Sequence, residues 1–396
     1  MAETRDFGLT VFGATGFTGG LCAEYLGEHL PDDIPWALAG RNAEKLQAVH
    51  DALAASGVAN LPTLLSADIN DQASLEKMAL RSKVIITTVG PYVWYGEGLV
   101  RACADNGTHY CDLTGEPEFV CNMITRYHQS ARKTGAAIVN CCGFDSIPHD
   151  AGALFTMREL ARACGGPPQG RVTLQGVVTA SGTFSGGTWQ SALTAFGRPR
   201  ENQIAMRHAR MLLDHEYPKT AHALAPLPRR DTELGGWLCP MPTIDPFMVM
   251  RSARAVSGYG NDFHYGHYLA SKSLPKMVGG IGGIGGLLLA AQIKPVRERL
   301  LTLRQSGEGP AKEKRDRSWF KVTFRGEADG TRVITQVSGG DPGYDETAKM
   351  LAETAMGLAL DKDAPRATGV VTPVMALEDG LVKRLQKARI HFQRLI

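Results

Sequence analysis

The sequence is short of the features that mark several classes of protein. Aromatic residues make up only 7% of the 396 positions, and Lys and Arg outnumber Asp and Glu by only 43 to 40, which gives a net charge of +3. Nucleic-acid-binding proteins instead concentrate basic residues on one face, with aromatic residues among them. We therefore expect no nucleic-acid partner.

The sequence also lacks the signs of export and of a metal site. Its first residues, MAETRDFG, include acidic side chains and lack the apolar region of a secretory leader. We therefore expect a cytoplasmic protein whose eight cysteines are reduced thiols. The cysteines form no Cys-x-x-Cys pair and have no spacing with histidine that is typical of zinc sites, so no metal site is predicted.

The first 149 residues carry the clearest structural pattern. Short apolar, β-branched runs alternate with segments of ten or more helix-compatible residues. Such spacing requires crossover connections, and therefore a parallel sheet with helices on both faces. We predict an α/β fold with a doubly wound Rossmann domain over residues 1–149. Its strands are expected at 9–12, 36–39, 61–65, 84–89, 109–112 and 137–140.

The pattern changes after residue 150. Strand-like runs at 171–178, 319–326 and 331–338 mix with helical segments, and the last two are joined by Ala328-Asp329-Gly330, a connection typical of an antiparallel hairpin. We predict a second α+β domain with a mixed or antiparallel sheet over residues 150–343. Residues 344–396 are expected to form a C-terminal helical segment that packs back on the Rossmann domain.

One segment is unusually apolar. Residues 277–293 contain no charged side chain and include six glycines in the pattern GGIGGIGG. Its length is at the short limit of a membrane span, and each glycine costs a soluble helix about 1 kcal/mol relative to Ala. Lys272, Lys276, Lys294, Arg297 and Arg299 flank the segment and suit a membrane surface. Three interpretations remain open: a membrane span, a peripheral contact with lipid or the inner membrane face, and a buried or substrate-lining segment.

The strongest motif is the glycine-rich turn at 13–19, which follows the first predicted strand and opens a predicted helix. In a dinucleotide-binding fold, Gly13 permits the tight turn, Gly16 lets the backbone approach the pyrophosphate, and Gly19 lets helix and strand pack closely. The helix N-terminus presents N–H groups and a positive dipole to the phosphates. We expect the cofactor to lie against Gly13, Ala14, Thr15, Gly16, Phe17, Thr18 and Gly19.

The end of the second predicted strand indicates which dinucleotide binds. NAD-binding folds place an acidic residue there for the ribose 2′-hydroxyl, but this sequence has Ala39-Gly40-Arg41-Asn42. The planar guanidinium of an arginine pairs well with a 2′-phosphate, so Arg41, with Asn42 beside it, predicts NADP(H). Asn42 is also suited to cap the next helix. Asp68, near the end of the third strand, is expected either to bind the adenine amino group or to cap a turn.

The fourth predicted strand ends at Val89-Gly90-Pro91. Ligands of open parallel sheets bind at such carboxyl ends, so we expect Val89, Gly90 and Pro91 to contact the cofactor.

The candidates for catalysis follow strand ends on the same side. A hydride transfer needs a proton donor and a group that polarises the reacting double bond. Our catalytic candidates are Tyr92, Asp145 and His149, and Tyr95 and Glu116 share their location. Each has a structural alternative; Asp145, for example, is also suited to cap the helix that follows it.

Several blocks spread over nearly the whole chain are typical of one family. They are GATGFTG (13–19), LAGR (38–41), TTVGPYVWYGEGLVRAC (87–103), DLTGE (112–116), CGFDSIPHD (142–150) and TPVMAL (372–377). In these blocks the chain resembles the saccharopine dehydrogenase-like oxidoreductases, and within them the bacterial trans-acting enoyl reductases. The resemblance implies an NADP-binding Rossmann domain, a second domain of the saccharopine-reductase type, and, for the enoyl reductases, work on acyl chains in glycolipid biosynthesis.

The resemblance does not fix the reaction. We expect an enoyl reductase-like enzyme that transfers hydride to an acyl or lipid-linked substrate. One alternative is an NADP-binding scaffold or sensor at a lipid surface without turnover. The other is an amino-acid oxidoreductase of the saccharopine dehydrogenase type, in which Arg251 and Arg254 would bind substrate carboxylates, although both could equally face solvent or bind a lipid phosphate. The oligomeric state stays open.

Overall fold

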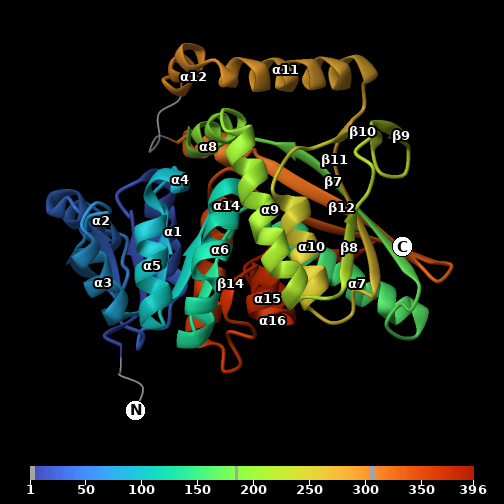
Figure 1. The fold of residues 1–396 in the computed structure, drawn as a ribbon. Coiled ribbons are helices and arrows are strands. Elements are labelled where there is room, and N and C mark those ends of the chain that lie inside the picture. The colour runs from blue at the N-terminus through green and yellow to red at the C-terminus, as the bar shows by residue number, and fades with distance from the viewer. Residues whose placement is uncertain (1–4, 183–185, 304–308) are drawn as a thin grey trace.

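The computed structural model describes residues 5–182, 186–303 and 309–396. Its strands form two sheets, and helices cover and separate them (Figure 1). The first sheet has seven parallel strands in the order β14-β6-β5-β4-β1-β2-β3. The bounds of its first six strands are β1 Phe7–Phe12, β2 Trp36–Gly40, β3 Thr63–Ser66, β4 Ser82–Thr87, β5 His109–Asp112 and β6 Ala137–Val139. This order is that of a doubly wound sheet, so the predicted Rossmann domain is confirmed.

Helices lie on both faces of the first sheet, which explains its uninterrupted apolar strands. Along β4, Val84 and Ile86 belong to the core on one face, and Ile85 belongs to the core on the other. The helices of this part are α1 Phe17–His29, α2 Ala43–Ala55, α3 Gln72–Arg81, α4 Tyr92–Tyr95, α5 Glu97–Asn106, α6 Pro117–Thr134 and α7 Ile147–Cys164. Helix α7 begins before residue 150, so the predicted boundary between the domains falls inside a helix.

The second sheet is mixed. Its order is β15-β13-β12-β7-β11-β10-β9, and β8 pairs with β11. Strand β11 runs parallel to β7 and β8, while the other pairs are antiparallel. The bounds are β7 Arg171–Ser181, β8 Thr220–Ala223, β9 Arg229–Asp231, β10 Gly236–Pro240, β11 Asp262–Ser271, β12 Trp319–Ala328, β13 Thr331–Gly339 and β15 His391–Arg394. A mixed sheet was one of the two predicted forms.

The predicted hairpin joins β12 to β13. Ala328 pairs with Thr331, so the turn consists of Asp329 and Gly330, both with positive φ (51° and 75°). The sequence had suggested a connection of three residues. A two-residue turn with positive φ at both positions matches the right-handed twist of the strands better, and it favours Asp-Gly.

The end of the chain contributes to both sheets. Helix α14 (Asp345–Leu360) packs on α1 and β4, and β14 (Gly369–Val371) extends the first sheet beside β6. Helices α15 (Pro373–Leu377) and α16 (Asp379–Lys387) follow, and β15 then pairs with β13 in the second sheet. The segment is mostly helical, and α14 packs back on the Rossmann sheet as expected, but the two short strands were not predicted. Strands of three and four residues are too short to show a period of two, and the sheets to which they add determine their conformation.

The remaining helices surround the second sheet. Their bounds are α8 Gly186–Phe196, α9 Pro199–Glu216, α10 Asp245–Ala255, α11 Leu274–Gln292, α12 Lys294–Leu301 and α13 Lys312–Arg315. Helix α9 packs on α6, and α10 packs on β8, β11 and α7.

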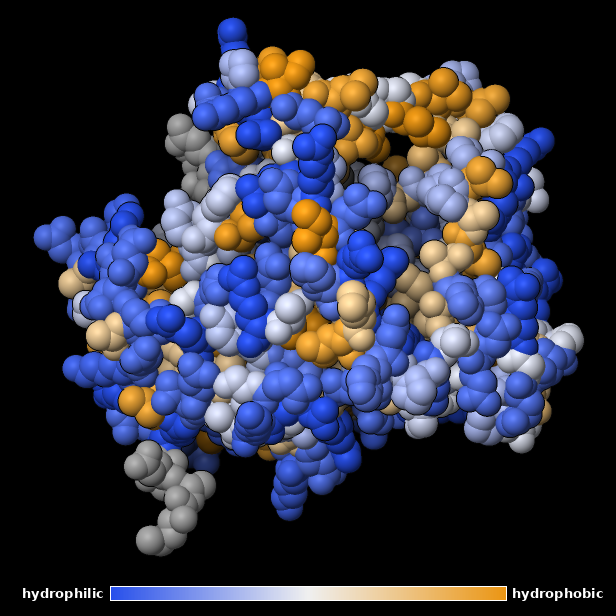
Figure 2. All heavy atoms as spheres, in the orientation of Figure 1, coloured by the Kyte–Doolittle hydropathy of each residue, from blue (hydrophilic) through white to orange (hydrophobic). Residues whose placement is uncertain are grey.

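Helix α11 contains most of the apolar segment and stands at the outer edge of the molecule (Figure 1). Only Met277 and Ala291 of this helix are buried, whereas Val278, Ile281, Ile284 and other apolar residues are exposed. Figure 2 shows apolar atoms along the top of the molecule, where Figure 1 places α11, with an opening beneath them. The interpretation as a buried segment was therefore wrong. Among the described residues, α11 is the one helix that is long and apolar enough to cross a membrane.

Candidate functional site

The candidate site lies at the carboxyl edge of the first sheet, where the loops after its strands meet. Every sequence candidate for cofactor binding lies in a loop, or at the start of a helix, that follows β1, β2, β3 or β4. The catalytic candidates follow β4 and β6. In doubly wound folds this edge binds the ligand at the point where the strand order reverses, here between β1 and β4.

Gly13 and Gly19 leave no room for side chains. Gly13 has a φ of 93°, and a Cβ atom there would lie 2.8 Å from Val89 Cγ2. A Cβ at Gly19 would lie 2.2 Å from the carbonyl oxygen of Gly13. Both positions therefore require glycine. The close packing that results brings the N-terminus of α1 next to the ends of β1 and β4. Gly16 is the N-cap of α1 and makes no side-chain cap bond, so the helix end is open to an anionic ligand.

The side chain of Phe17 packs toward the second part of the chain. Its ring contacts Tyr344 edge-to-face at 5.0 Å, and the Arg315 guanidinium lies over it at 5.2 Å. Phe17 therefore joins the glycine loop to α13 and α14, while its backbone remains part of the predicted phosphate-binding turn.

The predicted ribose and adenine residues have different surroundings. Arg41 is exposed directly after β2. Asn42 caps α2, because its Oδ1 accepts a hydrogen bond of 2.8 Å from Lys45 N. Asp68 caps a turn in which its Oδ1 accepts from Asn70 N at 2.9 Å. Asp68 therefore caps a turn through Oδ1, and Arg41 is the exposed and charged basic residue of this set.

Val89, which follows β4, packs against the glycine loop at Gly13. Its methyl group occupies the space where a Gly13 side chain would lie, and its N–H donates to Thr87 Oγ1 at 3.3 Å. Gly90 is exposed, and Pro91 is the N-cap of α4. These residues therefore border the glycine loop, as a contact with the cofactor would require.

Tyr92 and Glu116 fix the turn after β4 through hydrogen bonds. The Tyr92 hydroxyl is buried and donates to the Thr87 carbonyl oxygen at 3.1 Å, and burial raises its pKa well above the usual value. The Glu116 carboxylate accepts from Tyr92 N at 3.0 Å and from Val93 N at 2.8 Å. Both residues are therefore engaged in supporting α4, and this geometry argues against Tyr92 as the proton donor.

Asp112 is a buried carboxylate that the sequence candidates did not include. It accepts from Tyr110 Oη at 2.9 Å, Asn140 Nδ2 at 2.7 Å, and the N–H groups of Thr114 and Cys141. Burial raises the pKa of this carboxyl to about 6, and those hydrogen bonds oppose the rise. Asp112 therefore ties the loops after β5 and β6 together. The position of Asp112 at the end of β5 was the feature of the sequence that could have identified it as a candidate.

Asp145 lies at the meeting point of the DLTGE and CGFDSIP blocks. Its Oδ2 would be 3.3 Å from a Cβ at Gly115, so the carboxyl lies directly against the backbone of that glycine. The residue is half-buried, and desolvation raises its pKa to about 6. A carboxyl with such a pKa is able to donate a proton near neutral pH.

His149 lies deeper, in the first turn of α7. Its ring is buried, contacts Phe144 at 5.9 Å between centroids, and contacts His267 at 4.6 Å. Burial and the neighbouring His267 lower its pKa well below the usual value. The His149 imidazole is therefore uncharged and cannot donate a proton as an imidazolium.

The two arginines considered for substrate carboxylates are used by the protein itself. Arg251 is buried and donates to the Val370 carbonyl oxygen at 2.7 Å. Arg254 donates to the carbonyl oxygens of Lys219 and Tyr217 and pairs with Asp214 at 2.8 Å. Neither is available to bind a saccharopine-type substrate.

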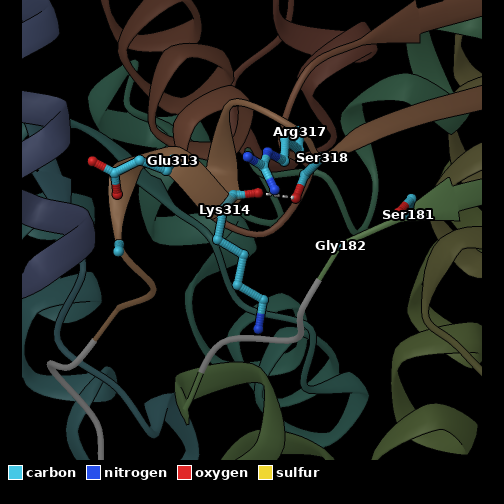
Figure 3. A pocket seen from close by; sticks show the side chains of 7 residues that line it. Ser181, Gly182, Glu313, Lys314, Arg317 and Ser318 are labelled. Atoms are coloured by element: carbon cyan, nitrogen blue, oxygen red, sulfur yellow. Dashed lines mark hydrogen bonds between the residues drawn. The ribbon is translucent and has the colours of Figure 1, made fainter.

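An open hollow of about 420 Å³ lies between the end of β7 and α13 (Figure 3). Its lining residues are Ser181, Gly182, Ala311, Glu313, Lys314, Arg317 and Ser318. The same short helix carries Arg315, which lies over Phe17 of the glycine loop. The hollow itself offers two cationic side chains, Lys314 and Arg317.

Comparisons with known proteins agree with this geometry. Residues 9–139 match the family described as "Saccharopine dehydrogenase NADP binding domain". The chain is 35% identical to a Mycobacterium tuberculosis protein named "Putative trans-acting enoyl reductase", over 99% of this chain and 98% of that protein. It is 32% identical to the human "Saccharopine dehydrogenase-like oxidoreductase", over 98% of this chain and 97% of that protein. The solved structure of apo saccharopine dehydrogenase (L-Glu forming) from Saccharomyces cerevisiae is similar with a TM-score of 0.55 at 15% identity, covering 98% of this chain and 99% of that one. At that identity the likeness concerns the fold alone.

Proposed function

Because the chain belongs to the saccharopine dehydrogenase-like oxidoreductase family, we propose that it is an NADP-dependent enoyl reductase that acts in trans on an acyl or lipid-linked substrate. The observation that carries this proposal is the similarity, over nearly the full length, to mycobacterial proteins named as trans-acting enoyl reductases. The family alone gives an NADP-binding oxidoreductase; the enoyl substrate is the proposed part.

The residues at the sheet edge fit an NADP molecule. The turn at 13–19 and the open N-terminus of α1 would bind the pyrophosphate, and Arg41 would bind the 2′-phosphate. Val89, Gly90 and Pro91 would contact the nicotinamide half. When bound, NADPH supplies the hydride.

Asp145 is our candidate for the proton donor. Reduction of an enoyl thioester needs a proton at the carbon next to the carbonyl group, after hydride has reached the other carbon of the double bond. The Asp145 carboxyl has a pKa of about 6, and it is half-buried beside Gly115. Tyr92 and His149 are less suited, since the first donates its proton to Thr87 and the second is buried and uncharged.

The exposed apolar residues of α11 support the proposal that the substrate is lipid-linked. Its exposed residues include Val278, Ile281, Ile284 and Leu289, with exposed fractions of 39–69%. Large exposed apolar patches mark interaction sites, and the exposed Lys272, Lys276, Lys294 and Arg299 at the two ends of the helix suit anionic headgroups. We infer that α11 lies in the plane of an anionic lipid surface at the inner membrane face, where the acyl substrate would be found.

The connections of α11 favour peripheral contact over a membrane span. A span would place the ends of the helix on opposite sides of the bilayer. Here β11 enters the helix from the second sheet, while α12 leaves it and packs on α8. The indole N–H of Trp189 on α8 donates to the carbonyl oxygen of Leu300 on α12 at 2.8 Å. Both ends are therefore fixed to the same body of protein.

The test combines turnover with binding. Oxidation of NADPH is followed with a panel of enoyl and keto thioesters, and reduction of NADP+ is followed with saccharopine, beside a direct NADPH binding titration. The proposal expects NADPH binding and turnover with an enoyl thioester. Binding without turnover would favour the scaffold alternative, and turnover with saccharopine alone would favour the amino-acid oxidoreductase.

A further inference from the structure

Three side chains from distant parts of the chain meet in the interior. His149 lies on α7, Asp245 is the first residue of α10, and His267 lies on β11. Their side chains are only 3%, 3% and 1% exposed. One potential ligand atom from each residue lies within 4.8 Å of those of the other two.

The distances within this cluster are too long for strong hydrogen bonds. His149 Nε2 lies 3.4 Å from Asp245 Oδ1, and His267 Nε2 lies 3.6 Å from Asp245 Oδ2. Side-chain hydrogen bonds are usually about 2.7–3.2 Å. Ligand atoms that surround one cation at about 2.0–2.2 Å, in contrast, are spaced by roughly 3.0–3.6 Å. The histidine–carboxylate distances therefore match two ligands of a shared ion better than donor and acceptor.

The cluster also leaves polar atoms unsatisfied. Asp245 Oδ1 and His267 Nε2 are buried without a hydrogen-bond partner, and such atoms cost free energy in a packed interior. Within the described parts of the chain, the basic side chains within 4 Å of the Asp245 carboxylate are the two histidines. A cation between the three residues would satisfy the orphaned atoms and compensate the buried carboxylate.

Both histidines present the same ring nitrogen to the carboxylate, since the Nε2 atoms of His149 and His267 are the ones that approach Asp245. Tyr265 Oη lies 3.4 Å from His267 Nδ1, which leaves Nε2 facing the cluster.

We propose that His149, Asp245 and His267 form a buried site for one divalent transition-metal ion, with Zn²⁺ as the best match. Two imidazoles and one carboxylate suit zinc and its neighbours in the first transition row. The ion would link α7, α10 and β11, which belong to different parts of the fold. The sequence predicted no metal site, because these ligands are separated by tens of residues and form no local motif.

The first test uses the whole protein, purified without affinity metals. It is incubated with Zn²⁺, desalted, and analysed for metal by mass spectrometry, and thermal unfolding is recorded with added Zn²⁺ or with a chelator. We expect about one Zn²⁺ per chain, a higher Tm with Zn²⁺, and a lower Tm after chelation. Co²⁺ should give a visible absorption band that Zn²⁺ displaces. These readouts do not depend on reductase activity, so the metal proposal and the proposed function can fail separately.

Matched variants locate the site. His267→Gln and His149→Gln should lower Zn²⁺ affinity by more than the about 10–100-fold caused by loss of an outer-shell partner. The control is the double variant His222→Gln/His264→Gln. It removes a more exposed histidine pair around Asp262, where His264 already makes a 2.8 Å contact with the carboxylate. This control should bind Zn²⁺ like the wild type.

Two results would overturn the proposal. One is a wild-type protein that holds no Zn²⁺ after desalting and whose Tm responds neither to Zn²⁺ nor to the chelator; ordered water would then satisfy the cluster. The other is Zn²⁺ binding that persists in His267→Gln and is lost in the His222→Gln/His264→Gln control. The wild-type measurements remain decisive even if the buried variants fail to fold.

Discussion

The hydroxyl group of Ser191 donates a hydrogen bond of 2.7 Å to Glu116 Oε1. Ser191 lies on α8, and Glu116 holds the N–H groups of Tyr92 and Val93 at the turn after β4. Helix α8 also packs on α11 and α12. A single carboxylate therefore connects the loop that borders the cofactor site to α8, the helix on which the proposed lipid-contacting helix α11 packs.

Arg41→Ala should weaken NADPH binding and leave NADH binding nearly unchanged. Charge-assisted hydrogen bonds contribute about 1.5–3 kcal/mol, which corresponds to roughly ten- to hundred-fold in affinity. Because Arg41 is exposed, wild-type NADPH binding should also weaken with salt. Fluorescence titration of both cofactors measures the effect, and Arg101→Ala, which removes another exposed arginine, is the control. Equal losses for NADPH and NADH would contradict the assignment.

Asp145→Asn should lower turnover by about 10²–10⁴-fold, the usual contribution of a general acid, while NADPH still binds. The pKa of Asp145 is raised to about 6, so the carboxyl holds its proton below that pH and loses it above. Wild-type kcat should therefore fall as pH rises through about 6, and the variant should lack this limb. Tyr92→Phe is the comparison, since it removes only a hydrogen bond to the backbone, and its turnover should change little. A larger loss of turnover in Tyr92→Phe than in Asp145→Asn would make Tyr92, and not Asp145, the proton donor.

Gly19→Ala should abolish NADPH binding or prevent folding, because the new methyl group would lie 2.2 Å from the Gly13 carbonyl oxygen. Gly20→Ala is the matched control, since its methyl group would lie 3.7 Å from the Ala14 carbonyl oxygen, which is an ordinary van der Waals contact. Replacement of a helical glycine by alanine in open space stabilises by about 0.4–1 kcal/mol. The Tm should therefore fall in Gly19→Ala and rise slightly in Gly20→Ala, and NADPH binding should be lost in the first variant and kept in the second. Equal behaviour would mean that the loop is not as closely packed as described.

Ile281→Asp/Ile284→Asp should reduce co-sedimentation with anionic lipid vesicles without lowering the Tm, since both side chains are 39% exposed. Charges on the apolar side of an interfacial helix oppose its burial among lipid tails. Leu227→Asp, at an exposed leucine outside α11, is the control and should bind vesicles normally. Wild-type binding should fall as salt rises, because basic flanks attract anionic headgroups. If the wild-type protein does not co-sediment with the vesicles, the lipid-surface part of the proposed function is wrong.

Much of the first sheet could be predicted from the sequence because its determinants are local. The glycine turn, the buried strand runs and the Asn42 cap each depend on residues close together in the chain. The orientation of Tyr92 could not be predicted, because Thr87 and Glu116 determine it through the folded loops. The cluster of His149, Asp245 and His267 could not be predicted either, since only packing of α7, α10 and β11 brings the three together.

The first sheet depends on residues from the far end of the chain. Strand β14 covers the edge of β6, and α14 covers one face of the sheet by packing on α1 and β4. A ribosome that has released only residues 1–149 has therefore produced a sheet with an open edge and an uncovered apolar face, and such surfaces promote aggregation. During synthesis the nucleotide-binding half would have to wait for residues 345–371 before it could close. Expression of that half alone should give an insoluble product, while the whole chain folds as one unit.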